Sequence, residues 1–111
     1  MAFDPTGFSI SISDRDGRAV VVIRGELDLA TAPELEAAIQ GRLDEGQDVV
    51  VDLRELEFMD STGLRVLVSA HARVEGTEQR FLIVRPLPGA SIERILAVAG
   101  VEQVLDLVDD A

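Results

Sequence analysis

The sequence of 111 residues contains no cysteine, no lysine and a single histidine, His71. The absence of cysteine excludes disulfide bonds and thiol chemistry, and one histidine cannot assemble the common zinc sites. The absence of lysine excludes a phosphate-loop lysine, a Schiff-base lysine and a lysine general base. We therefore expect no bound metal, no cofactor and no nucleotide chemistry carried out by this chain alone.

Long apolar runs and a positive charge balance are also missing. No run approaches the roughly 18 residues of a membrane-spanning helix, and residues 1–5 lack the pattern of a secretory leader, so we expect a cytoplasmic protein. The formal net charge of −11 disfavours nucleic acid and anionic membranes as partners. The charge fits solubility alone or an acidic face for a basic protein partner, and composition does not separate the two.

The chain is rich in apolar residues, which make up 47% of it and suffice for one hydrophobic core. We predict a single domain over residues 8–108, between a loose N-terminus at 1–7 and an acidic tail at 109–111. No internal repeat, low-complexity segment or linker interrupts it.

The N-terminal pattern predicts a β-hairpin. Strict alternation of apolar and polar residues at 8–13 is typical of an edge strand with one buried face. Turn residues at 14–17 lead into the apolar run 19–23, a second strand paired with the first. We expect Gly25 to end this strand, with residues 26–29 as an acidic connection.

A helix and a central strand are predicted next. Thr31 and Glu34 have the spacing of a capping box, which places the helix start there. The apolar run at 48–53 is typical of a buried central strand. The apolar stripe of the helix is expected to be Leu35, Ala38, Ile39 and Leu43.

A hydroxyl residue stands where the following helix should begin. Ser61 follows Asp60, so we predict that its oxygen caps the helix by accepting a backbone N–H. A helix N-terminus carries unpaired N–H donors and about half a unit of positive charge, so a phosphate on Ser61 would be tolerated there. The expected apolar stripe consists of Leu64, Leu67, Val68 and His71. We assign the histidine to packing at the core edge rather than to catalysis.

The C-terminal part predicts one more strand and one more helix. Gly76 should close the preceding helix, and residues 80–84 form a buried strand. Ser91 is expected to cap a last helix that stops at Gly100, and residues 101–108 hold a short strand or a docking turn. The element order ββαβαβα therefore indicates an α/β fold with a mixed sheet.

Three sequence features together resemble one bacterial family. These are Phe-Met-Asp-Ser-Thr-Gly-Leu at 58–64, Gly-Glu-Leu-Asp at 25–28 and Thr-Ala at 31–32. Their order and separation are similar to those of the anti-sigma factor antagonists, which are single STAS domains. The resemblance covers nearly the whole chain and implies a STAS-like mixed sheet with helices mainly on one face.

The resemblance also implies a phospho-switched binding protein rather than an enzyme. In this family a kinase that is also the anti-sigma factor phosphorylates the first hydroxyl after the motif aspartate, which here belongs to Ser61. The unphosphorylated form would bind the kinase and release a sigma factor, a PP2C-like phosphatase would reset it, and the free protein would be a monomer. Arg65 departs from the family, since many members carry glycine there. The implied partner-binding residues are Glu26, Asp28, Thr31, Asp60, Ser61, Thr62, Gly63 and Arg65.

Three other functions share parts of this pattern. A non-switching STAS scaffold subunit of a stressosome-like or lipid-transport assembly would keep the same motifs, and only a partner or phosphorylation assay separates it. A hydrolase with Ser61 as nucleophile would need a Gly-x-Ser-x-Gly elbow, but position 59 is methionine, and His71 lies about 15 Å along the same helix. A two-component receiver would need a lysine late in the chain, which is absent.

Overall fold

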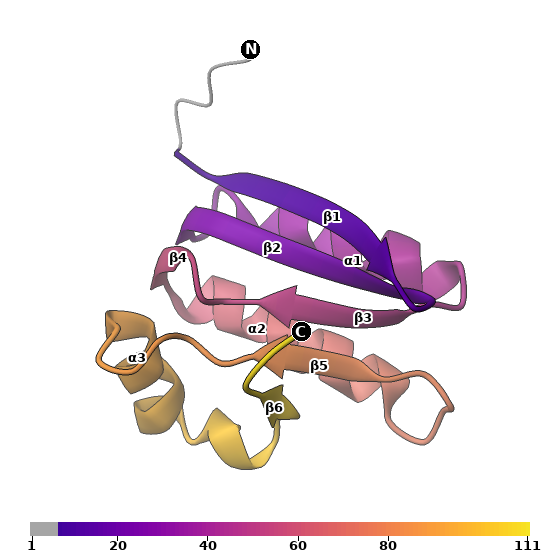
Figure 1. Ribbon diagram of the computed structural model, residues 1–111. Coiled ribbons are helices and arrows are strands. Elements are labelled where there is room, and N and C mark those ends of the chain that lie inside the picture. Colours follow the sequence, from indigo (N-terminus) through magenta and orange to yellow (C-terminus); the bar gives the residue numbers. More distant parts are fainter. Residues whose placement is uncertain (1–6) are drawn as a thin grey trace.

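The computed structural model describes residues 7–111 (Figure 1). Its elements are β1 (Ser9–Arg15), β2 (Arg18–Leu27), α1 (Ala32–Asp44), β3 (Asp48–Asp52), β4 (Leu56–Met59), α2 (Ser61–Val74), β5 (Phe81–Val84), α3 (Ser91–Ala99), a 3₁₀ helix (Val101–Gln103) and β6 (Leu107–Val108). The predicted N-terminal segment, residues 1–7, lies outside the described residues apart from Gly7. No helix in the described part is long and apolar enough to cross a membrane.

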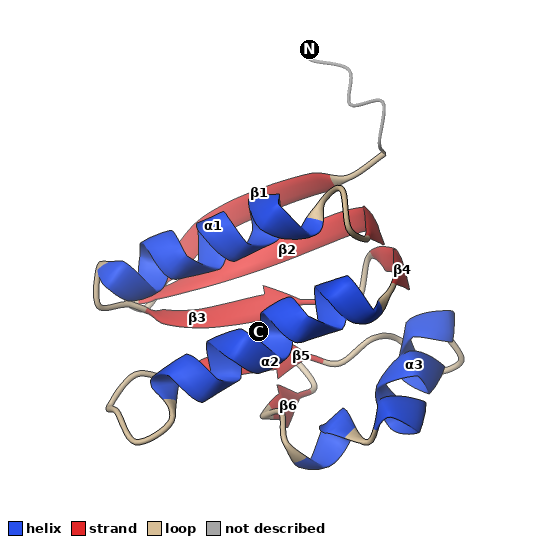
Figure 2. Ribbon diagram, turned by 180° about the vertical axis from the view of Figure 1, so that it is seen from behind, coloured by secondary structure: helices blue, strands red, loops and turns tan. Residues whose placement is uncertain are grey.

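The strands form one mixed sheet in the order β1-β2-β3-β5-β6, and β4 pairs with the end of β2. Only β1 is antiparallel to its neighbour, which confirms the predicted hairpin. All other pairs are parallel. Figure 2 shows α1 and α2 side by side across one face, while α3 lies beside β4. The predicted α/β class, with helices mainly on one face, is confirmed.

The main core lies between the sheet and the two helices. Alternate residues of the central strands point into it, among them Val49, Val51, Phe81 and Ile83. Both β3 and β5 are buried on their two faces, which explains their continuous apolar sequences. The predicted edge strand is confirmed in position but not in burial, because Ile12 is 36% exposed.

The apolar stripe of α2 differs from the predicted one. Leu64, Val68 and His71 are only half-buried and lie on its flank. Small residues on the sheet side let the helix approach the strands closely, and a pattern based on large side chains misses them. The buried positions are Gly63, Val66, Leu67, Ala70 and Val74.

The chain does not end β2 at Gly25, contrary to the prediction. Gly25 adopts a φ of 91°, and a Cβ placed there would lie 1.9 Å from the carbonyl oxygen of Gly7. The strand shifts register at this point, leaves β3 and continues beside β4. Glu26 therefore lies in a strand and pairs with Phe58. The short strand β4 was not predicted.

The last helix begins differently from the prediction. Ala90 occupies the N-cap position, and Ser91 is the first helical residue, without a capping hydrogen bond. The Ser91 hydroxyl instead donates to the carbonyl oxygen of Glu57 at 3.4 Å, which ties α3 to β4. Gly100 ends the helix in the left-handed conformation, as predicted.

The C-terminal residues lie over the sheet face opposite the helices (Figure 1). Val108 and Ala111 pack against a second apolar cluster of Val50, Leu82 and Val84. Two ion pairs accompany this packing: Arg85 with Asp109 at 2.6 Å, and Arg54 with Asp110 at 3.5 Å.

Candidate functional site

The α2 helix starts directly at the end of β4, and Asp60 is its cap. The Asp60 carboxylate accepts hydrogen bonds from the backbone N–H groups of Thr62 at 2.9 Å and Gly63 at 3.1 Å. Its own N–H donates to the carbonyl oxygen of Leu27 at 3.1 Å, which anchors the turn to β2. The prediction that Ser61 caps the helix is wrong, because the helix begins at Ser61 and the preceding carboxylate satisfies the free N–H donors.

Ser61 consequently has a free hydroxyl. Its side chain is exposed, and it forms no hydrogen bond with any described residue. It stands on the first turn of α2, where the helix dipole favours negative charge, although Asp60 already accepts from the N–H groups of Thr62 and Gly63. An attached phosphate would therefore break no hydrogen bond among the described residues, and the helix dipole would offset part of its charge.

Gly63 sets the distance between this turn and the sheet. It is buried, and a Cβ placed on it would lie 2.6 Å from Cγ of Leu27 and 3.0 Å from Cγ of Met59. Both neighbouring side chains are at most 1% exposed, so an added methyl group would have to displace them. The Ser61 turn is thus held directly against the ends of β2 and β4.

The connection after β2 is organised by Thr31, which is only 5% exposed. Its hydroxyl donates to the carbonyl oxygen of Glu26 and accepts from the N–H of Asp28, each at 2.9 Å. The Asp28 carboxylate accepts from the N–H groups of Ala30 and Thr31 at 3.0 and 3.2 Å. The predicted capping box with Glu34 is wrong, because the threonine hydroxyl turns back to the strand end instead of capping α1.

The two turns lie at the same edge of the sheet because β2 and β4 are parallel neighbours, with Leu27 paired to Met59. The structure thereby brings together the residues predicted for partner binding, although their side chains differ in access. Glu26, Ser61 and Arg65 are exposed, whereas Thr31 and Gly63 are buried and can only position the backbone. A small depression between the helix starts is lined by Leu29, Ala32, Pro33, Glu36, Thr62, Arg65 and Val66.

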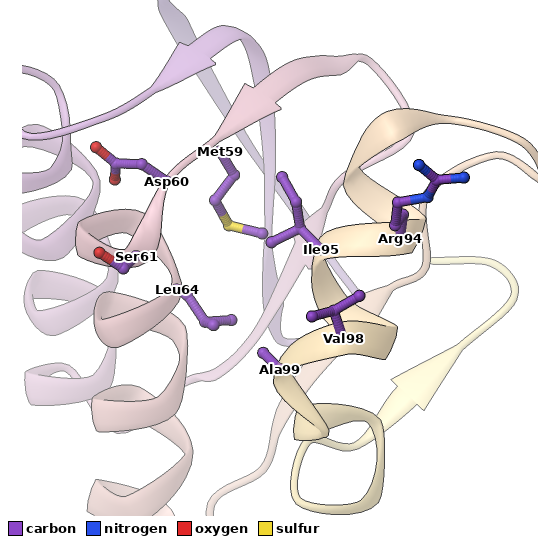
Figure 3. A pocket seen from close by; sticks show the side chains of 8 residues that line it. All are labelled: Met59, Asp60, Ser61, Leu64, Arg94, Ile95, Val98 and Ala99. Atoms are coloured by element: carbon purple, nitrogen blue, oxygen red, sulfur yellow. The ribbon is translucent and has the colours of Figure 1, made fainter.

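A second, larger hollow lies on the other side of Ser61, between α2 and α3 (Figure 3). This apolar groove of about 430 Å³ is lined by Met59, Asp60, Ser61, Leu64, Arg94, Ile95, Val98 and Ala99. The sequence pattern of this last helix did not single out Val98 as a surface residue. Val98, which lines this groove together with Ser61, is 82% exposed, and Leu29, which lines the other depression beside Thr62, is 74% exposed. The available signal was that Val98 is an apolar residue on the side of α3 away from the buried Ile92 and Leu96.

Residues 10–109 match the protein-family model described as Mlab, STAS domain. The chain belongs to the STAS domain family. This STAS domain is 36% identical over 81 residues to the anti-sigma-F factor antagonist RsfB of Mycobacterium tuberculosis, covering 72% of the present chain and 66% of RsfB, just under two thirds of its length. It is 29% identical over 103 residues to the anti-sigma-B factor antagonist of Listeria monocytogenes, covering 89% of the present chain and 87% of the relative.

Solved structures agree with this assignment. An anti-sigma factor antagonist from Mycobacterium paratuberculosis superposes with a TM-score of 0.84 at 30% identity, covering 96% of this chain and 90% of that one. The unphosphorylated form of the anti-sigma factor antagonist SpoIIAA shares the fold, with a TM-score of 0.68, 21% identity and coverage of 94% and 89%. The STAS fold expected from the sequence motifs is confirmed.

Proposed function

We propose that this STAS domain is an anti-sigma factor antagonist controlled by phosphorylation of Ser61. The unphosphorylated form binds an anti-sigma factor serine kinase and so releases a sigma factor; phosphorylation ends this binding, and a PP2C-like phosphatase restores it. The observation that carries the proposal is the free, exposed hydroxyl of Ser61 on a rigidly capped helix start. The names of the relatives support the antagonist role.

The partner would dock over the end of the sheet at which Ser61 lies. Protein interfaces commonly combine an apolar centre with a polar rim. Here the exposed side chains of Leu29 and Val98 and the groove beside α3 supply apolar surface. Glu26 and Asp28 supply acidic groups suited to a basic partner surface. Thr31 contributes by fixing the loop rather than by touching the partner.

Phosphorylation would act on the interface and leave the fold intact. A phosphoserine adds about −1.5 to −2 charge at neutral pH. Because Asp60 caps the helix, the modification costs α2 no capping hydrogen bond, and the helix N-terminus offsets part of the charge. On docking, however, the doubly charged group beside Asp60 would have to lose water. A penalty of about 1.4 kcal/mol already weakens binding tenfold.

The test combines phosphate mapping with affinity measurements. The purified domain is incubated with candidate anti-sigma factor kinases and ATP, and mass spectrometry locates any phosphate. Calorimetry then compares the unmodified, phosphorylated and Ser61→Ala proteins. We expect phosphate on Ser61, binding at least tenfold weaker after phosphorylation, and persistent binding by Ser61→Ala. The matched control is Ser69→Ala, which replaces an exposed serine two turns along the same helix. This variant should be phosphorylated on Ser61 and should then dissociate from the kinase as the wild type does.

Two outcomes would contradict the proposal. Equal affinities of the phosphorylated and unphosphorylated forms would remove the switch, and a phosphate found only elsewhere would remove the assignment to Ser61. Charge reversal by Asp28→Arg should weaken binding, and unchanged affinity with an intact fold would move the contact surface away from that loop.

A non-switching scaffold subunit is the second candidate function. The apolar groove beside α3 favours it, because a permanent apolar interface needs no modification to form. Such a subunit would bind its partner equally well with and without phosphate on Ser61. The calorimetric comparison therefore separates the two functions directly.

A further inference from the structure

The pairing of arginine side chains is uneven over this acidic molecule. The chain has ten arginines and 21 acidic residues, so a carboxylate is a common neighbour. Ion pairs within the described residues involve Arg24, Arg42, Arg54, Arg73, Arg80 and Arg85. The arginines without one in this part of the chain are Arg15, Arg18, Arg65 and Arg94. The first two belong to the β1–β2 hairpin, whereas Arg65 and Arg94 lie around Ser61.

Arg65 stands in a specific relation to Ser61. It follows the serine by four residues within α2, and both side chains are exposed. Side chains at this spacing lie on the same helix face, with Cβ atoms about 5–6 Å apart. An anion placed N-terminal to a cation is the favourable order for such a pair. Helical side chains lean toward the helix N-terminus, so the long Arg65 side chain can reach back to a phosphate on Ser61 one turn earlier.

The neighbouring charges leave this guanidinium available. Glu36 of α1 lines the same small depression as Arg65, yet the two form no ion pair. Asp60 is engaged in capping α2 through its carboxylate. Arg94 borders the groove on the other side of Ser61, but its guanidinium points away from the serine (Figure 3). Among the arginines of the described residues, Arg65 is thus the one poised to receive a phosphate at this position.

We propose that Arg65 is the intramolecular counter-ion of phosphorylated Ser61. This inference rests on the proposed function in one respect, that Ser61 carries a phosphate. In the unmodified protein the guanidinium is free to meet an acidic group of the partner. In the phosphorylated protein it pairs with the dianion through charge-assisted hydrogen bonds. Phosphorylation then changes the docking surface in two ways: it adds the phosphate dianion, and it makes the Arg65 guanidinium unavailable to the partner.

The experiment measures the phosphate itself. Phosphoserine is installed at position 61 during synthesis by genetic-code expansion, so no kinase is required, and its ³¹P resonance is titrated between pH 4 and 9. The variants are Arg65→Ala, Arg65→Lys and, as the matched control, Arg94→Ala. A nearby cation favours the dianion, while Asp60 and Glu36 oppose it equally in all four proteins. Circular dichroism of each variant verifies the fold.

We expect Arg65→Ala to raise the midpoint of the ³¹P titration by about 0.3 pH units, Arg65→Lys to restore part of the difference, and Arg94→Ala to leave it unchanged. An unchanged midpoint in Arg65→Ala, or an equal shift in Arg94→Ala, would overturn the assignment. Because phosphoserine is incorporated during synthesis without a kinase, absence of a cognate kinase would refute the proposed function without affecting this result.

Discussion

Replacing Gly63 by alanine tests whether the Ser61 turn is held directly against the sheet. Gly63 lies in the first turn of α2, and an added Cβ would come within 2.6 Å of Leu27 Cγ. Gly41 offers a matched control, because it lies within α1 and an added Cβ there meets nothing within 4 Å. Both substitutions introduce the same methyl group into a helix, so their difference isolates the contact with the strands.

The two variants should change stability in opposite directions. Alanine is favoured over glycine within a helix by about 0.5–1 kcal/mol, so Gly41→Ala should be stabilised by that amount. Gly63→Ala gains the same term but must displace buried side chains, and overpacking of this kind costs about 1–3 kcal/mol. We therefore expect Gly63→Ala to be less stable than Gly41→Ala by about 1–3 kcal/mol.

Urea unfolding followed by circular dichroism measures this difference, since the chain has no tryptophan or tyrosine to report by fluorescence. Kinase binding measured alongside should weaken in Gly63→Ala, because a displaced helix start moves Ser61 on the docking surface. If Gly63→Ala proved as stable as Gly41→Ala, the close approach of α2 to the strands would be wrong.

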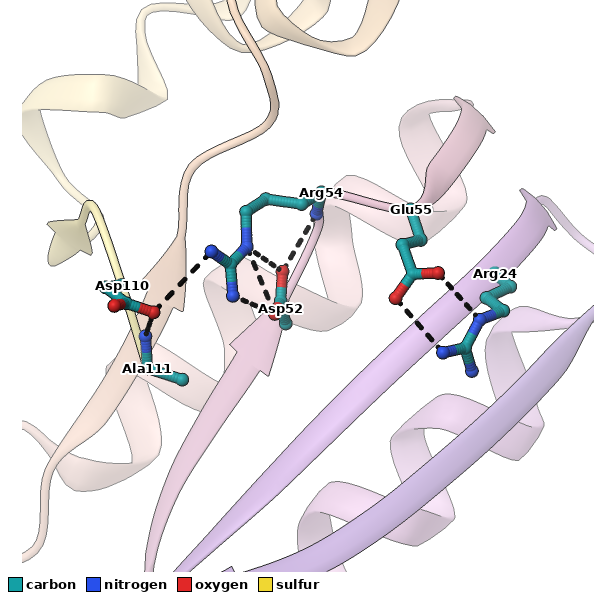
Figure 4. Close-up of polar contacts among 6 residues, drawn as sticks. All are labelled: Arg24, Asp52, Arg54, Glu55, Asp110 and Ala111. Atoms are coloured by element: carbon teal, nitrogen blue, oxygen red, sulfur yellow. Dashed lines mark hydrogen bonds and ion pairs between the residues drawn. The ribbon is translucent and has the colours of Figure 1, made fainter.

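Two further predictions concern carboxylates. Asp60→Ala should lower the free energy of unfolding by about 0.5–2 kcal/mol, while Asp60→Asn, which keeps a capping oxygen, should lose much less in the same urea assay. Burial raises the pKa of Asp52, but hydrogen bonds and charge from Arg54 outweigh it and hold that pKa below its ordinary value (Figure 4). The ionised Asp52 therefore stabilises the folded protein fully above about pH 4, the pKa of an unfolded aspartate, and this stabilisation is lost as the pH falls through the lower pKa of the folded state. The thermal midpoint of the wild type should exceed that of Asp52→Asn above about pH 4, and this difference should shrink below that pH. A gap independent of pH down to 2 would contradict this.

Much of the fold was predictable because its patterns are local. Alternation at residues 8–13 identified the edge strand, and the apolar runs at 48–53 and 80–84 identified two central strands. The glycine signal at the end of α3 was equally direct, since Gly100 adopts a conformation that other residues resist. Each of these patterns involves only a few adjacent residues, and tertiary contacts did not alter the secondary structure that it predicts.

The errors arose where a tertiary contact decided between equivalent local choices. Gly25 is a strand breaker by propensity, yet here it allows β2 to bend past the backbone of Gly7 and continue. Thr31 has capping-box spacing, yet the strand end takes its hydroxyl. Val98 lies in an apolar helix, but which side faces α2 depends on where α3 is placed along β4. The outcomes at Gly25 and Val98 depend on residues far away in the sequence, whereas the Thr31 hydroxyl bonds to Glu26 and Asp28 just before it.

The exchange of roles between Asp60 and Ser61 has the largest consequence for function. Had Ser61 capped α2, a phosphate on its oxygen would have removed a structural hydrogen bond, and modification would have been coupled to the stability of the helix. Because Asp60 provides the cap, the Ser61 oxygen forms no hydrogen bond with a described residue. Modification of this oxygen therefore changes the surface and not the contacts within the fold. Thermal melts of unmodified and phosphorylated protein should then nearly coincide while their affinities for the partner differ. Under the proposed function, release would then work through charge at the interface and not through unfolding, and a phosphatase would reset the domain without refolding.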